Sequence, residues 1–462
     1  MRAGAGERPS AAGGANHGIW GWIQRFMGDY RQATPHRRVG LLAWYAWKAA
    51  YVGTLTVLHG VLFNPWLLRL WVKLLKGRVE FFGTSGTIAD LCLADYYVKR
   101  KRDLNASVFS LFLANKPHIA NRYLASFLAS TLGDPRTRFV LSRFVCRLLT
   151  PLERRLFFGA GPTDRFTRHA QQCHELNARY RFHLERRLPM VERQRARGLM
   201  RTLGLPLDGK FVCVHAREAG FKAHFQPDGH NTYRDIDILT YVPAITYLIE
   251  RGFWVVRMGE PTVKPLPAME RLIDYARSPL KSECLDVVLV AECEFLLGCN
   301  SGFSQLARLF NKLALWTNSV PIEMCPWDEL ALWIPRLLFS TREDRFLTFP
   351  EIVSRGVGQY HRTQEYEAAG LIPQENSAEE ILEATQELYR WFRGKTEALE
   401  DRQAQHAFNR LFPPHYNAYG TRSRICASFI RAHAELMPQA DAPAVSDRAG
   451  AWPRCETMTG DG

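Results

Sequence analysis

The chain has 462 residues, enough for two or three domains, and its 47% hydrophobic content is that of an ordinary globular protein. A net charge of +14 favours anionic partners such as phosphates or an acidic membrane surface. The ten cysteines form no CxxC pair, so we expect reduced thiols and no metal. Because no basic stretch is interleaved with aromatic residues as in a nucleic-acid-binding module, we expect no nucleic-acid partner.

Both ends of the chain are rich in small and polar residues, which predicts disorder over 1–17 and 437–462. We find no pattern of a cleavable signal peptide and expect a cytoplasmic protein, with the inner face of the plasma membrane as an alternative location.

Residues 18–77 form a helical apolar segment, whose central part, 41–75, allows three interpretations. Ala49 to Leu68 carries no Asp, Glu, Lys or Arg, and this length is sufficient to span a bilayer. The Asn64-Pro65 pair weakens that interpretation. Four tryptophans with flanking Arg and Lys are typical of a membrane interface. Buried amphipathic helices, docking on a membrane surface and a membrane span all stay open.

Residues 78–204 are predicted to form an α/β domain. Arg78–Phe82 is a predicted strand, followed by the sequence GTSGT and a helix, and Ser107–Leu113 is a second strand. A helix with an apolar stripe at Tyr123 and Phe127 comes next. The remainder, to about residue 187, is rich in arginine and mostly helical.

Residues 205–375 show a clearer alternation of strands and helices. We predict strands at Phe211–Val214, Phe253–Met258, Phe295–Cys299 and Leu313–Trp316, with helices between them. These strands are continuously apolar, as strands buried on both faces are, which predicts a doubly wound parallel sheet. Capping boxes at Thr348/Glu351 and Ser377/Glu380 open further helices. The helix opened by Ser377 is the longer one, in a helical region over 376–436, and we expect this helix to run back to the first domain.

Polar residues follow three of the predicted strands, and in a parallel sheet these strand ends meet at one edge. Arginine forks pair with phosphate oxygens and a helix N-terminus favours anions, so this edge is suited to a diphosphate. Each element alone has an ordinary alternative: a salt-bridged arginine, a structural histidine or a simple helix start. The residues are His215, Arg217 and Glu218; Arg257, Gly259 and Glu260; and Asn300, Ser301, Gly302 and Ser304.

Three sequence elements carry a family resemblance. HARE at 215–218 resembles the H-x-R element of the O-fucosyltransferase and nodulation-type fucosyltransferase superfamily. FWVVRMGE at 253–260 and AECEFLLGCNSGFSQLARLF at 291–310 are similar to its second and third elements. The series over 211–354 resembles more closely a bacterial family of largely uncharacterised glycosyltransferases, whereas the first 200 residues match much less distinctly.

The resemblance implies a GT-B architecture, in which two facing Rossmann-like domains with parallel sheets follow the N-terminal helices, with the acceptor bound on the side of the N-terminal domain. The C-terminal domain is then expected to bind a GDP- or UDP-linked sugar, with no metal and no other cofactor. By the same resemblance Arg217 contacts the diphosphate, and Ser301, Gly302 and Ser304 form the turn around it. Gly259 and Asn300 belong to the same donor-binding elements. Arg257 and Asp274 lie in elements that border the nucleotide, although Asp274 is equally well explained as a helix-end carboxylate.

One departure weakens the assignment of GDP-fucose as the donor. The fucosyltransferases usually carry two consecutive arginines where this chain has Arg217-Glu218. The expected reaction is transfer of a sugar from the nucleotide to a glycan or lipid-linked acceptor, and we take an inverting displacement as the working hypothesis. Arg217 stabilises the leaving diphosphate, and Glu218 or His215 accepts the acceptor's proton, with Asp235 as a further candidate. Glu218 alternatively pairs with an arginine.

Two other classes of function stay open at this point. One is a non-catalytic basic membrane scaffold built on residues 41–75. The other is a sugar-nucleotide epimerase on the same fold, which would convert the donor without an acceptor.

Overall fold

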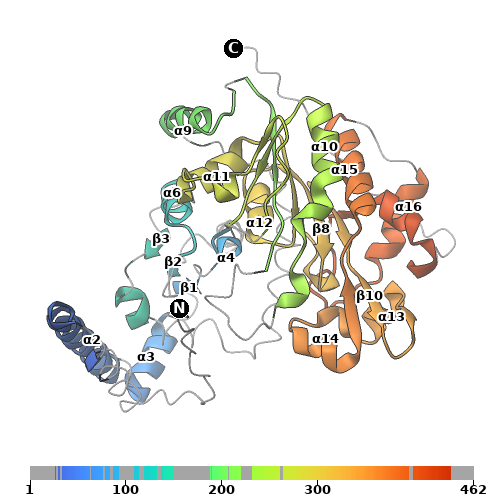
Figure 1. The fold of residues 1–462 in the computed structure, drawn as a ribbon. Coiled ribbons are helices and arrows are strands. Elements are labelled where there is room, and N and C mark those ends of the chain that lie inside the picture. Colours follow the sequence, from blue (N-terminus) through green and yellow to red (C-terminus); the bar gives the residue numbers. More distant parts are fainter. Residues whose placement is uncertain are drawn as a thin grey trace, which may run out of the picture.

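The computed structural model shows an α/β protein, as predicted (Figure 1). It describes residues 27, 30–31, 34–62, 64–75, 79–83, 87–92, 109–113, 119–132, 137–140, 142, 144–149, 188, 190–206, 208–219, 231–260, 264–394 and 399–438. The disorder predicted for 1–17 and almost all of 437–462 lies outside these residues, as does most of the arginine-rich stretch up to 187.

A seven-stranded sheet forms the core of the larger unit, and all its paired strands are parallel. Its order is β13-β9-β8-β7-β4-β5-β6. The strands are β4 (Phe211–Val214), β5 (Trp254–Arg257), β6 (Leu272–Ile273), β7 (Phe295–Cys299), β8 (Leu313–Ser319), β9 (Ala331–Pro335) and β13 (Arg424–Ile425). From β4 the chain winds outward through β5 and β6, then returns to β7 and winds the other way. The switch point of the predicted doubly wound sheet therefore lies between β4 and β7.

Helices cover both faces of this sheet, which explains why its strands are continuously apolar (Figure 1). One face carries α10 (Val242–Glu250) and α15 (Ala378–Phe392), and the other carries α11 (Glu283–Glu292) and α12 (Gly302–Leu309). The expectation that the helix opened by Ser377 reaches the first domain was wrong. That helix is α15, and its buried residues, including Ile381 and Leu388, pack it against α10 and β8.

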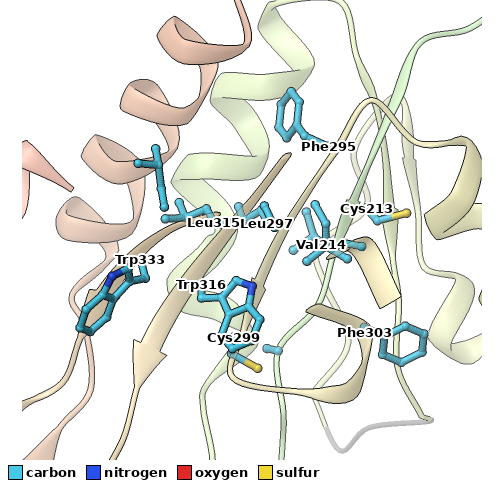
Figure 2. Close-up of a cluster of buried hydrophobic side chains, with 14 of the residues drawn as sticks. Cys213, Val214, Phe295, Leu297, Cys299, Phe303, Leu315, Trp316 and Trp333 are labelled. Carbon is cyan, nitrogen blue, oxygen red and sulfur yellow. The ribbon is translucent and has the colours of Figure 1, made fainter. Parts of the chain in front are cut away.

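The buried centre of the sheet lies beside the switch point. Figure 2 shows Leu315, Leu297 and Val214 in a row across β8, β7 and β4, and the strand register pairs them in that order. Every residue of β7 and of β8 is buried. Burying a side chain of this size contributes about 1.5–3 kcal/mol, so the geometry of the β4 and β7 ends is fixed by the core beneath them.

A second, antiparallel sheet, which the sequence analysis did not predict, packs at the end of the larger unit. Its order is β11-β10-β12. Both predicted capping boxes are confirmed, at Thr348 and at Ser377. The elements of this region are β10 (Leu337–Ser340), β11 (Arg345–Phe346), α13 (Phe349–Ser354), α14 (Thr363–Ala369), β12 (Leu371–Gln374), α16 (Leu399–Asn409) and α17 (Ala427–Ala432).

The N-terminal unit contains a three-stranded parallel sheet in the order β1-β2-β3. Its elements are β1 (Val79–Gly83), α4 (Ile88–Cys92), β2 (Phe109–Leu113), α6 (Arg122–Leu132) and β3 (Thr137–Val140), and α9 (Met190–Thr202) leads to the larger unit. The helix α4 packs on α12, and α6 packs on α11. Two α/β units, each with a parallel sheet, are thus in contact through these helices.

Residues 41–75 are helical, in α2 (Pro35–Leu62) and α3 (Pro65–Leu75). Among the described residues no single helix has the length and hydropathy of a membrane span. Arg37–Leu62 and Pro65–Leu75 reach these values together, but the pair is bent by 70°. The bend falls at the Asn64-Pro65 pair.

Candidate functional site

The predicted site residues lie where the strands of the large sheet end, at the switch point. Beyond β4 the backbone continues beside β7, because the His215 amide donates a 2.9 Å hydrogen bond to the Leu297 carbonyl. Val214 pairs with Arg257 on β5 and with Leu297 on β7. Residues 215–218, 257–260 and 299–304 therefore emerge at one edge of the sheet. Ligands of doubly wound folds bind at such an edge.

His215 is held as a neutral imidazole at this edge. Its Nδ1 lies 3.3 Å from the Met258 carbonyl oxygen, and because that oxygen can only accept, Nδ1 carries the proton. The lone pair then sits on Nε2. The ring packs against Phe303 of α12, with 4.8 Å between the ring centroids. Burial is the largest cause that lowers the pKa of His215 to about 4.

Gly259 makes room for this histidine. Its φ of +126° is a backbone conformation that favours glycine, and a Cβ atom there would lie 3.2 Å from His215 Nδ1. The chain can therefore turn sharply after β5 and still deliver the Met258 carbonyl to the imidazole. This gives the predicted donor-loop glycine a backbone role at the site.

The buried neutral state of His215 predicts a pH dependence of stability. Its folded pKa lies below its unfolded value of 6.5, so the unfolded chain binds more protons between pH 6.5 and pH 4. Above pH 6.5 the neutral His215 contributes fully to the free energy of unfolding, and about 3 kcal/mol of this contribution is lost as the pH falls from 6.5 to 4. Urea melts at pH 7 and pH 4.5 should show a smaller loss for His215→Asn than for wild type. The same loss in both proteins would contradict the assignment, and His406→Asn, on an exposed histidine, is the control.

Arg217 lies beside the end of β7. Burial raises the pKa of the Cys299 thiol, and the Arg217 guanidinium is one of the charges that oppose this rise. Arg217 Nη1 donates to Asp235 Oδ1 at 2.6 Å and to the Asn231 carbonyl at 2.9 Å. Within the described part of the chain, Nη2 and Nε have no hydrogen-bond partner. The side chain is 10% exposed, so Asp235 orients a guanidinium that keeps donors for a ligand.

Arg234, which the sequence analysis missed, brings a second guanidinium to the same place. It is the last residue of the short 3-10 helix Thr232–Arg234, and its Nη2 donates to the Asn300 carbonyl. Its positive charge contributes to lowering the pKa of Arg217, after the larger effect of burial. Arg217 follows β4, whereas Arg234 comes from a separate segment of the chain. Arg234 directly precedes Asp235, which was the available signal.

The turn at 300–304 is held by its own polar groups. Asn300 Nδ2 donates to the Met324 carbonyl at 3.2 Å, and Ser304 Oγ donates to the Cys299 carbonyl at 2.5 Å. Ser304 is fully buried, so its hydroxyl fixes the turn and does not face a ligand. The Ser301 hydroxyl is buried next to the Cys299 thiol, and its interaction with this thiol opposes the rise that burial causes in the pKa of Cys299.

Gly302 opens α12 in close contact with the N-terminal unit. A Cβ atom at this position would lie 2.9 Å from Ile88 Cβ at the start of α4. The first amides of α12, those of Gly302, Phe303 and Ser304, find no backbone acceptor among the described residues. Both guanidiniums and the start of α12 thus lie at the same edge of the sheet, next to Cys299 and Asn300. Guanidiniums and helix N-terminal amides are groups that suit a diphosphate.

Glu218, Arg257 and Asp274 form a charge network at the ends of β4 and β5, centred on the buried Arg257. Arg257 Nη2 donates to Glu218 Oε2 at 2.5 Å, while its Nη1 donates to Asp274 Oδ2 at 3.0 Å and to the Lys264 carbonyl at 3.1 Å. Arg257 is 1% exposed. The alternative that Glu218 pairs with an arginine is confirmed. That Arg257 and Asp274 border the nucleotide stays a prediction; here they brace the ends of β4 and β5.

Lys281 is a further cation at this edge that the sequence analysis did not single out. Its Nζ lies 3.2 Å from both carboxylate oxygens of Asp286 and 3.4 Å from Glu260 Oε1. Its charge contributes to lowering the pKa of His215. Among the described residues no group of three or more His, Cys, Asp or Glu is arranged to hold a metal ion.

Comparisons with known proteins give similarity among solved structures. No family model and no curated protein matches the chain. The glycosyl transferase family 9 protein of Veillonella parvula aligns with a TM-score of 0.37 at 12% identity, covering 68% of this chain and 97% of that one. The iron-containing dodecameric heptosyltransferase TibC, in complex with ADP-D-β-D-heptose, aligns with a TM-score of 0.35 at 14% identity, covering 69% of this chain and 78% of that one. The Escherichia coli ADP-heptose heptosyltransferase II aligns with a TM-score of 0.33 at 12% identity, covering 56% of this chain and 90% of that one.

Proposed function

We propose that the chain is a glycosyltransferase that takes a sugar from a nucleoside-diphosphate donor and uses no metal. One observation carries the proposal: Arg217, Arg234 and the first amides of α12 gather at the switch point between β4 and β7. This is the place where a doubly wound fold binds a nucleotide, and the groups there are those that bind phosphate oxygens.

In the proposed reaction an acceptor hydroxyl attacks the anomeric carbon of the donor sugar. The bond between this carbon and the β-phosphate oxygen breaks, and its electron pair leaves with the diphosphate. Arg217, Arg234 and the α12 amides stabilise the negative charge that develops there. Such fixed donors in a protected site are usually the largest single contribution to catalysis. Positive side chains thus do the work that a metal ion performs in other transferases.

The proton of the acceptor hydroxyl needs a base, and His215 is the candidate that the geometry favours. Its Nε2 carries the lone pair, because Nδ1–H is turned to the Met258 carbonyl. Glu218 is less suited, since its carboxylate is paired with the buried Arg257 guanidinium. Asp235 is partly exposed but is engaged by Arg217. Direct attack of this kind inverts the configuration of the sugar.

For the donor we propose a GDP- or UDP-linked sugar, and for the acceptor a glycan or a lipid-linked molecule. The Arg217/Arg234 pair supports the donor class, since it supplies in space the two arginines that the fucosyltransferases carry in sequence. This pair does not determine which sugar the donor carries, because both guanidiniums lie where the phosphates, not the sugar, would bind.

A thermal-shift screen of the full chain with UDP, GDP and ADP tests the proposal. At about 100 times Kd a ligand adds about 2.7 kcal/mol to the free energy of unfolding, so at least one diphosphate should raise the Tm by several degrees. The matching nucleosides, uridine, guanosine and adenosine, lack the phosphates and should have little effect. If no diphosphate shifts the Tm, or if the nucleosides shift it equally, the diphosphate site is refuted.

A further inference from the structure

The two N-terminal helices, α2 and α3, carry many exposed apolar side chains. Of the eighteen large hydrophobic side chains that are exposed in the described part of the chain, twelve lie between residues 39 and 74. They include Trp47 at 63% and Trp66 at 79% exposure. A helix on the surface of a globular protein normally turns polar residues outward. In α2 and α3 many of the exposed residues are instead valine, leucine and tryptophan, and a large exposed apolar patch of this kind marks an interaction surface.

Only a narrow stripe of α2 faces the protein. Among the described side chains of this helix, Tyr45 and Leu55 are the buried ones. His59 Nε2 lies 3.0 Å from the Arg147 carbonyl, and the Tyr51 ring contacts Phe144 at 5.9 Å between centroids. These contacts fix which side of the helix points outward. Figure 1 shows α2 and α3 at the periphery, away from the seven-stranded sheet.

The charge of this segment selects one partner. From Pro35 to Leu75 the sequence contains no Asp or Glu, whereas Arg37, Arg38, Lys48, Arg69 and Lys73 are all cationic. Lys48 Nζ lies 4.5 Å from the Trp44 ring and the Arg69 guanidinium 5.7 Å from the Trp66 ring. Tryptophan beside Lys or Arg on an apolar face is the composition of helices that lie in a membrane interface with anionic lipid.

The shape of the helix pair favours docking over spanning. With 28 residues α2 is about 42 Å long, and α3 turns away from it by 70°. Cations occur along both helices rather than at their ends alone, at Lys48 in α2 and at Arg69 and Lys73 in α3. A helix that lies in the plane of the interface can keep such side chains in the headgroup layer.

We propose that α2 and α3 dock the protein on the surface of an anionic phospholipid bilayer. The inference stands on these helices and not on the diphosphate site. It also bears on the acceptor: α3 leads directly into β1 and α4, and α4 packs on the first residue of α12. A membrane surface bound by α2 and α3 would therefore lie on the side of the N-terminal unit, where a lipid-linked acceptor could approach.

Vesicle flotation of the full chain tests this inference. We expect binding to phosphatidylcholine vesicles that contain 30% phosphatidylglycerol, at least tenfold weaker binding to pure phosphatidylcholine, and release by high salt or alkaline carbonate. The double variants Trp47→Ser/Trp66→Ser and Arg69→Glu/Lys73→Glu should each bind at least tenfold more weakly. The matched control, Leu239→Ser/Ile372→Ser, removes two exposed apolar side chains elsewhere and should bind as wild type does.

Three results would overturn the proposal. The first is that the protein does not float with vesicles, forms a dimer in light scattering, and loses the dimer in the Trp47→Ser/Trp66→Ser variant. A second copy of the chain would then cover the apolar face of α2 and α3. Another is binding that withstands alkaline carbonate, which indicates a span. The third is binding that neither double variant weakens. Arg217→Ala should float like wild type, so a failed flotation with an intact nucleotide shift refutes the docking alone, and the reverse refutes the diphosphate site alone.

Discussion

Replacing Arg217 by alanine is expected to weaken the binding of a nucleoside diphosphate by 30- to 1,000-fold. The guanidinium is 10% exposed, and Asp235 orients it at the switch point. Losing one partner of a buried, hydrogen-bonded charge pair costs about 2–4 kcal/mol, which corresponds to this range. Calorimetric titration of wild type and variant with the diphosphate that gives the largest thermal shift measures the difference.

Two controls separate this effect from a general loss of charge or of structure. Arg355→Ala removes an arginine whose side chain is 41% exposed and paired with Glu343 and Glu351, so it should bind the nucleotide as wild type does. Arg217→Lys keeps the charge but not the fork, and should fall between wild type and alanine. Equal affinities for wild type and Arg217→Ala, with both proteins folded by circular dichroism, would show that the guanidinium does not face the ligand.

Replacing Glu218 by alanine is expected to destabilise the fold by about 3–5 kcal/mol, because it leaves part of a buried guanidinium without its counter-charge. Arg257 is 1% exposed, and Glu218 Oε2 is the acceptor of its Nη2. Equilibrium unfolding in urea measures the change. The result separates two roles for Glu218, since a catalytic base would lose activity without losing this much stability.

The amide variant makes the test sharper. Glu218→Gln keeps the shape and one hydrogen bond to Arg257 but removes the negative charge, so we expect a smaller loss than for alanine. Glu379→Ala, on an exposed carboxylate near the start of α15, should change the stability by less than about 0.5 kcal/mol. A Glu218→Ala protein as stable as wild type would refute the bracing role and return Glu218 to the candidates for the base.

The parts of the site that could be predicted are those where one local pattern determines the outcome. Continuous apolar runs at β4, β5 and β7 predict strands buried on both faces, and such strands are parallel. The carboxyl ends of parallel strands meet at one edge of the sheet. The polar residues after β4, His215 and Arg217, therefore lie at the same edge as the turn after β7. The capping boxes at Thr348 and Ser377 are local in the same sense and were confirmed.

The parts that could not be predicted depend on contacts between distant segments. Arg234 reaches the Asn300 carbonyl across 66 positions of sequence, and nothing near Arg234 encodes that partner. The sequence offers many carboxylates that could pair with Arg257. The pairing of β4 with β5 brings Glu218 to it, and Asp274 follows the neighbouring strand β6. For α15, an apolar face predicts burial but does not say against which unit.

The central claim is that Arg217 and the first amides of α12 bind the same diphosphate, and a structure of the complex with a nucleoside diphosphate tests it most directly. The account predicts phosphate oxygens within 2.7–3.2 Å of Arg217 and of at least one amide among Gly302, Phe303 and Ser304, with Arg234 beside them. A nucleotide bound elsewhere, or one whose phosphates contact neither Arg217 nor the start of α12, would contradict it.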